Sequence, residues 1–69
     1  MDQDRNTVFD IFRIDRVTND RFPVQAGLTR LQQAEEYAQR ETRARAPMGD
    51  KFVVLDTAGE VVFDPELRH

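Results

Sequence analysis

Residues 29–45 (TRLQQAEEYAQRETRAR) carry the only long helical pattern in the chain, and they constrain what the remaining residues can form. Small apolar side chains recur at helical spacing and make one narrow stripe on the predicted helix: Leu31, Ala34 and Ala38. Thr29 is the predicted N-cap, with Gln32 at capping-box spacing. Pro47 ends the helix because it has no backbone N–H to donate. We therefore expect a single helix with a small, flat apolar stripe.

The segment before the helix predicts two strands. The first is expected over 7–16 (TVFDIFRIDR), and its apolar side chains alternate toward both faces, unlike those of a half-buried strand. Either a bulge shifts the alternation midway, or the strand is central and partly covered on both sides, one cover being a second subunit. The second strand, 21–25, is expected at an edge, because Pro23 cannot donate to a ladder.

The segment after the helix predicts a β-hairpin. Residues 51–56 (KFVVLD) form one strand and 61–63 the other. The turn between them, DTAG, has Asp first and Gly59 fourth, which suits a type I turn followed by a left-handed glycine. The preceding residues, 46–50, are expected to form a loop.

Together these elements predict an α+β domain of order ββαββ, a four-stranded antiparallel sheet with one helix packed on one face. The domain is expected to span residues 7–65, with a flexible N-terminus at 1–6 and a flexible tail at 66–69. At 69 residues the chain is close to the smallest size that a core alone can hold together.

Composition argues against several classes of function. The chain has no Cys and no Ser, and its single His is the terminal residue, His69, so nucleophile–base pairs and histidine or thiolate zinc sites are not expected. We predict no enzyme activity, no cofactor and no metal. A net charge of −3 disfavours duplex-DNA binding. No apolar run is long enough to span a membrane, and the acidic start does not match a signal peptide, so a cytoplasmic protein is expected.

The leading hypothesis is a protein–protein interaction module, such as a small adaptor, inhibitor or assembly factor. A sheet with one helix leaves its second face uncovered, and the surplus apolar residues of the first strand would form an exposed patch there. We expect the module to self-associate as a dimer, with two copies joined face to face or edge to edge, and docking on a larger protein is the other possibility. The predicted contact residues all come from the first strand and its end: Val8, Asp10, Phe12, Arg13, Ile14 and Arg16. Asp10 is the only acid in an apolar setting, and a surface ion pair with Arg would also explain it.

The alternative hypothesis is single-stranded nucleic-acid binding. Aromatic residues interleaved with Arg on a strand can stack on bases while the guanidinium groups contact phosphates. Phe9, Phe12, Arg13 and Arg16 could form such a platform, with help from Arg21. Asp10 and Asp15 interrupt this pattern with negative charge.

Overall fold

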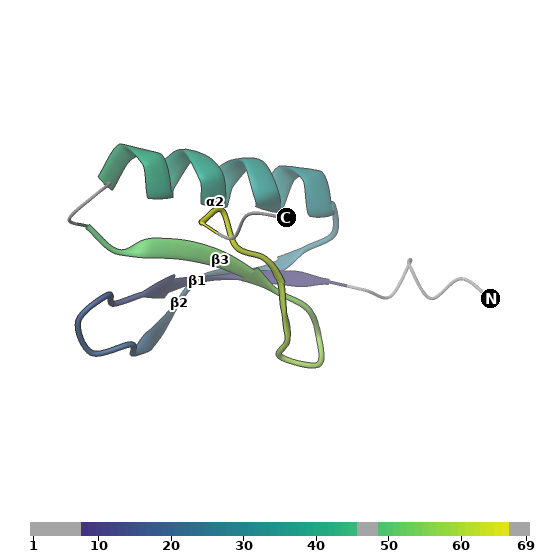
Figure 1. The fold of residues 1–69 in the computed structure, drawn as a ribbon. Helices are drawn as coiled ribbons and strands as arrows, with labels where there is room; N and C mark the ends of the chain where they lie inside the picture. The colour runs from purple at the N-terminus through teal and green to yellow at the C-terminus, as the bar shows by residue number, and fades with distance from the viewer. Residues whose placement is uncertain (1–7, 46–48, 67–69) are drawn as a thin grey trace.

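The computed structural model describes residues 8–45 and 49–66, and it confirms the predicted α+β fold. Four strands form one antiparallel sheet in the order β2-β1-β3-β4, and one helix lies across one face of it (Figure 1). The elements follow in the order ββαββ: β1 (Phe9–Ile14), β2 (Arg21–Leu28), α2 (Leu31–Arg45), β3 (Lys51–Leu55) and β4 (Val61–Phe63). The predicted termini, 1–6 and most of 66–69, lie outside the described residues.

The helix packs on the sheet through its small side chains, as the stripe predicted. Ala34 and Ala38 have no exposed surface and join one cluster with three strand residues: Ile11, Phe52 and Val54. Because alanine side chains are short, the helix can approach the sheet closely while the strands supply the larger side chains. Tyr37 meets the ring of Phe52 edge-on, with centroids 6.3 Å apart, and closes one side of this cluster.

The start of the helix differs from the prediction. β2 continues to Leu28, three residues beyond its expected end, so only Thr29 and Arg30 connect it to α2. Ala34 N donates to Arg30 O at 3.2 Å, which places Arg30 rather than Thr29 at the N-cap position. The capping-box prediction was wrong because the strand pairing, and not the local cap signal, determines where the chain turns.

Thr42 links the helix to β3 through a buried polar contact. Its side chain is 4% exposed, and its hydroxyl accepts a hydrogen bond from Phe52 N at 2.8 Å. The same hydroxyl donates to Phe52 O at 3.4 Å. β4 pairs with β3 at Val54 and Leu55, so the backbone of Phe52 lies beyond the end of that ladder. Thr42 therefore satisfies backbone groups that the short fourth strand does not reach.

The central position of β1 explains its unusual apolar pattern. β1 pairs with β2 on one side and with β3 on the other, and its pairing with β2 is interrupted by register shifts around Ile11. The extra residues at these shifts lie in β2, and β1 pairs with β3 without any shift, so no bulge interrupts the alternation of β1. The explanation by a central strand covered on both faces is therefore the one that applies, and the explanation by a bulge in β1 was wrong. Ile11 packs under the helix, while Ile14 joins a second cluster on the opposite face.

The turns at the two ends of the sheet are closed by hydrogen bonds. In the β3–β4 turn, Gly59 has a φ of 81° and its N–H donates to Asp56 O at 3.0 Å, as the DTAG pattern predicted. The β1–β2 turn, residues 15–20, lies at the other end of the sheet (Figure 1).

Candidate interaction surface

We call the side of the sheet opposite α2 the helix-free face. Cross-strand neighbours point to the same side, so the register assigns side chains to it. Phe12 stands between Pro23 of β2 and Val53 of β3, and Leu55 stands beside Val61 of β4. The result is a band of apolar side chains that crosses all four strands: Phe12, Ile14, Pro23, Val53, Leu55 and Val61.

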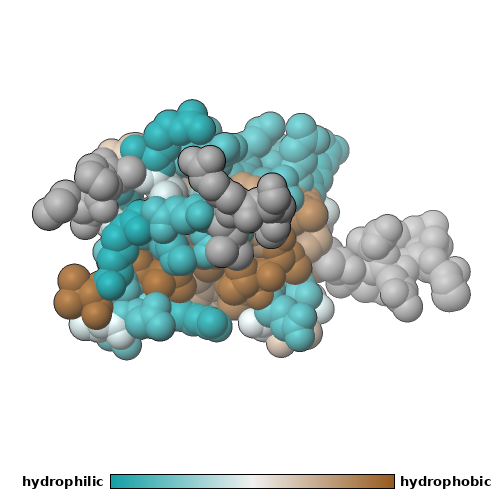
Figure 2. Space-filling view, viewed as in Figure 1, coloured by the Kyte–Doolittle hydropathy of each residue, from teal (hydrophilic) through white to brown (hydrophobic). Residues whose placement is uncertain are grey.

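Most of the centre of this band is buried, contrary to the expectation of a fully uncovered patch. Ile14 is 7% exposed and Val53 is 2% exposed, while Phe12 is half-buried against them. Arg21, Lys51 and Val61 line the same hollow as Ile14 and Val53. Exposed apolar surface remains at the margin, where Val61 is 43% exposed. The space-filling view, which looks at the edge of the sheet, shows apolar surface between the hydrophilic helix layer and a hydrophilic lower margin (Figure 2).

A small hollow opens on the helix-free face. Its volume is about 120 Å³, and its apolar lining comes from Ile14, Val53 and Val61. The polar lining comes from four residues around it: Asn19, Arg21, Lys51 and Asp64. Lys51 Nζ and Asp64 Oδ2 form an ion pair at 2.8 Å, so part of this charge is neutralised within the molecule.

Asp10 has a structural partner that the sequence did not indicate. Its carboxylate accepts a hydrogen bond from Gly27 N at 3.1 Å, in place of the expected arginine. Gly27 has a φ of 77°, and two residues of β2, Ala26 and Gly27, lie opposite the single residue Asp10. Such a bulge leaves a backbone N–H without a ladder partner, and the Asp10 carboxylate satisfies it. Val8, which directly precedes β1, is half-buried.

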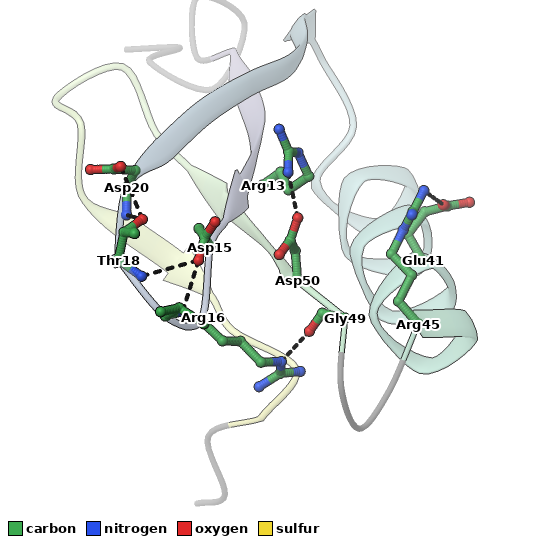
Figure 3. Close-up of polar contacts among 10 residues, drawn as sticks. Arg13, Asp15, Arg16, Thr18, Asp20, Glu41, Arg45, Gly49 and Asp50 are labelled. Atoms are coloured by element: carbon green, nitrogen blue, oxygen red, sulfur yellow. Dashed lines mark hydrogen bonds and ion pairs between the residues drawn. The ribbon is translucent and has the colours of Figure 1, made fainter.

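The two arginines of the predicted contact set point away from Phe12. Arg13 neighbours Phe22 and Phe52 on the helix side of the sheet, where its guanidinium pairs with Asp50 and lies 4.5 Å from the Phe22 ring centroid. Arg16 follows β1 and makes two hydrogen bonds to Glu66, at 2.8 and 2.5 Å. It makes a third hydrogen bond to the Gly49 carbonyl, which Figure 3 shows. The six predicted residues are therefore not a single cluster.

The Arg16 contact holds the end of the described chain against the β1–β2 turn. Hydrogen bonding to Arg16 lowers the pKa of Glu66 below its ordinary value, and the carboxylate in turn raises the pKa of Arg16. Glu66 was expected to begin a flexible tail; it is instead tied to the body of the domain, while 67–69 lie outside the described residues.

Sequence reasoning overlooked Val17, the most exposed large apolar residue among those described. It lies in the β1–β2 turn and is 92% exposed. Residues 15–20 (DRVTND) are rich in the turn formers Asp, Asn and Thr. A single valine within such a turn could have indicated an exposed apolar side chain. An apolar projection at the position of this turn is visible in the space-filling view (Figure 2).

No group of three or more His, Asp or Glu side chains among the described residues could hold a metal ion. No helix in the described part of the chain is long and apolar enough to cross a membrane. Comparison of the chain with protein-family models, curated proteins and solved structures found no match. The proposal for function therefore rests on the helix-free face described above.

Proposed function

We propose that this protein is a non-enzymatic interaction module that binds a protein partner through the helix-free face. The observation that carries the proposal is the apolar band across four strands, which ends in exposed Val61 and is bordered by charged side chains. An apolar centre with a charged rim is the usual composition of a protein interface.

The sheet edges are less suited to binding than the face. Edge-to-edge pairing needs a row of free backbone donors and acceptors. β2 contains Pro23, which has no N–H, and its pairing with β1 is interrupted by register shifts. β4 at the opposite edge has only three residues. These features favour face-to-face contact over strand addition.

The geometry does not favour single-stranded nucleic-acid binding. Stacking platforms need exposed rings beside unpaired cations. Phe9 packs against the cluster under the helix, whereas Phe12 lies on the opposite face. Arg13 and Arg16 both pair with carboxylates of the same chain.

Val61→Asp tests the proposed function because it places a charge at the exposed margin of the apolar band. Phe12→Asp is a poorer probe, since Phe12 packs against buried residues and its loss would also destabilise the domain. Gln39→Asp, on the exposed surface of α2, adds the same charge away from the face and serves as the matched control. Far-UV circular dichroism and thermal melting establish that all three proteins are folded.

Each protein is used as bait in host lysate treated with nuclease, and its own mass is measured by light scattering. We expect wild type and Gln39→Asp to retain the same protein partner or the same dimer, and Val61→Asp to lose it. Equal behaviour of all three proteins, or a wild-type protein that is monomeric and retains nothing, would overturn the proposal.

A further inference from the structure

Val17 is held outward at the tip of a tightly hydrogen-bonded turn. Asp15 Oδ1 accepts from Val17 N at 2.8 Å and from Thr18 N at 3.0 Å. Figure 3 shows the Asp15 side chain bonded within this turn. The backbone closes the same turn, with Asp15 N donating to Asp20 O at 3.0 Å and Asn19 N donating to Asp15 O at 2.7 Å. A β-branched side chain on a turn so well bonded loses little freedom on binding, because its backbone is already ordered.

The hollow on the helix-free face is of a size to receive such a side chain. Its volume is about 120 Å³, several times the roughly 10–15 Å³ that one water molecule needs by the same kind of measure, so there is room for a small side chain. Ile14 and Val53 give it an apolar floor, and Val61 gives it an apolar wall. Filling it with an apolar group would extend the second cluster of the sheet.

The charges around the turn and around the hollow are complementary. Asp15 and Asp20 flank Val17, and hydrogen bonds from the Thr18 and Val17 backbone lower the pKa of Asp15, so its carboxylate is charged at neutral pH. On the rim of the hollow, Arg21 makes no ion pair with any other described residue. The other two charged residues of the rim, Lys51 and Asp64, pair with each other. Arg16 of the turn pairs with Glu66.

We infer that a second copy of this chain docks here, with Val17 of each copy seated in the hollow of the other and the turn carboxylates facing Arg21. The β1–β2 turn ends at Arg21, and Arg21 also lines the hollow, so the turn and the hollow are neighbours on the surface. A two-fold axis beside Arg21 would therefore place the turn of each copy against the hollow of the other copy. This inference rests on the proposed use of the helix-free face and names the partner for it.

Sedimentation equilibrium from about 1 μM to about 1 mM protein tests the inference. Wild type is expected to dimerise, and Val17→Asp is expected to weaken dimerisation at least about tenfold because it removes a buried apolar group and adds a charge. Val17 is almost fully exposed, so this change leaves the monomer intact. Thr57→Asp, at the exposed tip of the other hairpin, adds the same charge and should dimerise like wild type.

A mixing experiment separates a specific contact from general stickiness. Val61→Arg blocks the hollow but leaves Val17 in place, whereas Val17→Asp leaves the hollow open. Each variant alone should be monomeric, and an equimolar mixture should form a heterodimer through the one contact that remains possible. Arg21→Glu should weaken the wild-type dimer as well, and added salt should weaken it further.

Three results would overturn the inference: a wild-type monomer at every concentration, dimerisation of Val17→Asp equal to wild type, or no heterodimer in the mixture. None of them requires the proposed function to fail. If Val17→Asp keeps its lysate partner and the double variant with Val61→Asp loses it, the helix-free face binds a partner other than a second copy, and only the further inference fails. If the wild-type protein neither dimerises nor retains a lysate partner, both the further inference and the proposed function are rejected.

Discussion

Replacing Thr42 by valine should destabilise the domain although the two side chains have almost the same shape. The hydroxyl is the acceptor for Phe52 N at 2.8 Å, and both residues are buried, at 4% and 3% exposed. Valine keeps the β-branch and the helix propensity, but it leaves this backbone N–H without a partner.

The size of the effect follows from the group left unpaired. A buried donor without an acceptor costs about 1–3 kcal/mol, and the more apolar valine recovers only part of that. We expect a loss of about 2 kcal/mol in the free energy of unfolding. For a domain of this size, each kcal/mol lowers the melting temperature by about 4–8 °C, so Thr42→Val should melt about 8–16 °C below wild type.

Urea unfolding followed by circular dichroism measures the loss directly, and amide hydrogen exchange reports on the Phe52 N–H itself. Thr42→Ser is the control, because it keeps the hydroxyl and removes one methyl group, at about 1 kcal/mol. Phe52 should exchange slowly in wild type and Thr42→Ser and rapidly in Thr42→Val. A Thr42→Val protein as stable as wild type, with Phe52 still protected, would refute the reasoning.

Three further predictions concern the bulge, the second turn and acid stability. Asp10→Ala removes the acceptor of Gly27 N and should cost about 1 kcal/mol, whereas Asp10→Asn keeps an oxygen and should cost less; equal losses in urea titrations would contradict this role. Gly59→Ala forces a non-glycine residue to a φ near 81° and should cost about 1–2 kcal/mol by thermal melting, with Gly59→Asn milder; an unchanged melting temperature would show that the turn relaxes. The pKa of Glu66 is lowered from 4.5 in the folded state, so the ion pair with Arg16 contributes its full stabilisation above about pH 4.5. That stabilisation is lost as the pH falls through the lower pKa of the folded state. Glu66→Gln should therefore flatten the acid side of the melting curve against pH, and an acid limb as steep as that of wild type would contradict the contact with Arg16.

Features that depend on neighbouring residues in the chain were predictable. The stripe of Ala34 and Ala38 follows from helical spacing, and both residues are fully buried against the sheet. The Asp56–Gly59 turn follows from the rarity of positive φ outside glycine. Pro23 indicated an edge strand, and β2 is at the edge. In each case the physical cause acts within a few residues.

The candidate surface was predicted only in part, because its properties come from residues far apart in the chain. Register, and not composition, placed Phe12 and Arg13 on opposite faces and aligned Val53 and Val61 with the apolar band. The partners of Arg16 lie 33 and 50 positions away, so no local pattern could reveal them.

Within residues 8–45 and 49–66, the amino-acid sequence by itself determined the helix, the four strands, their apolar sides and the turns between them, because backbone geometry and side-chain spacing act locally. Only the tertiary structure decided how much of the second face remains open. Burial depends on which strands become neighbours and on the cluster that Ile14, Val53 and Leu55 form with Phe12, and these contacts exist only once the sheet has formed.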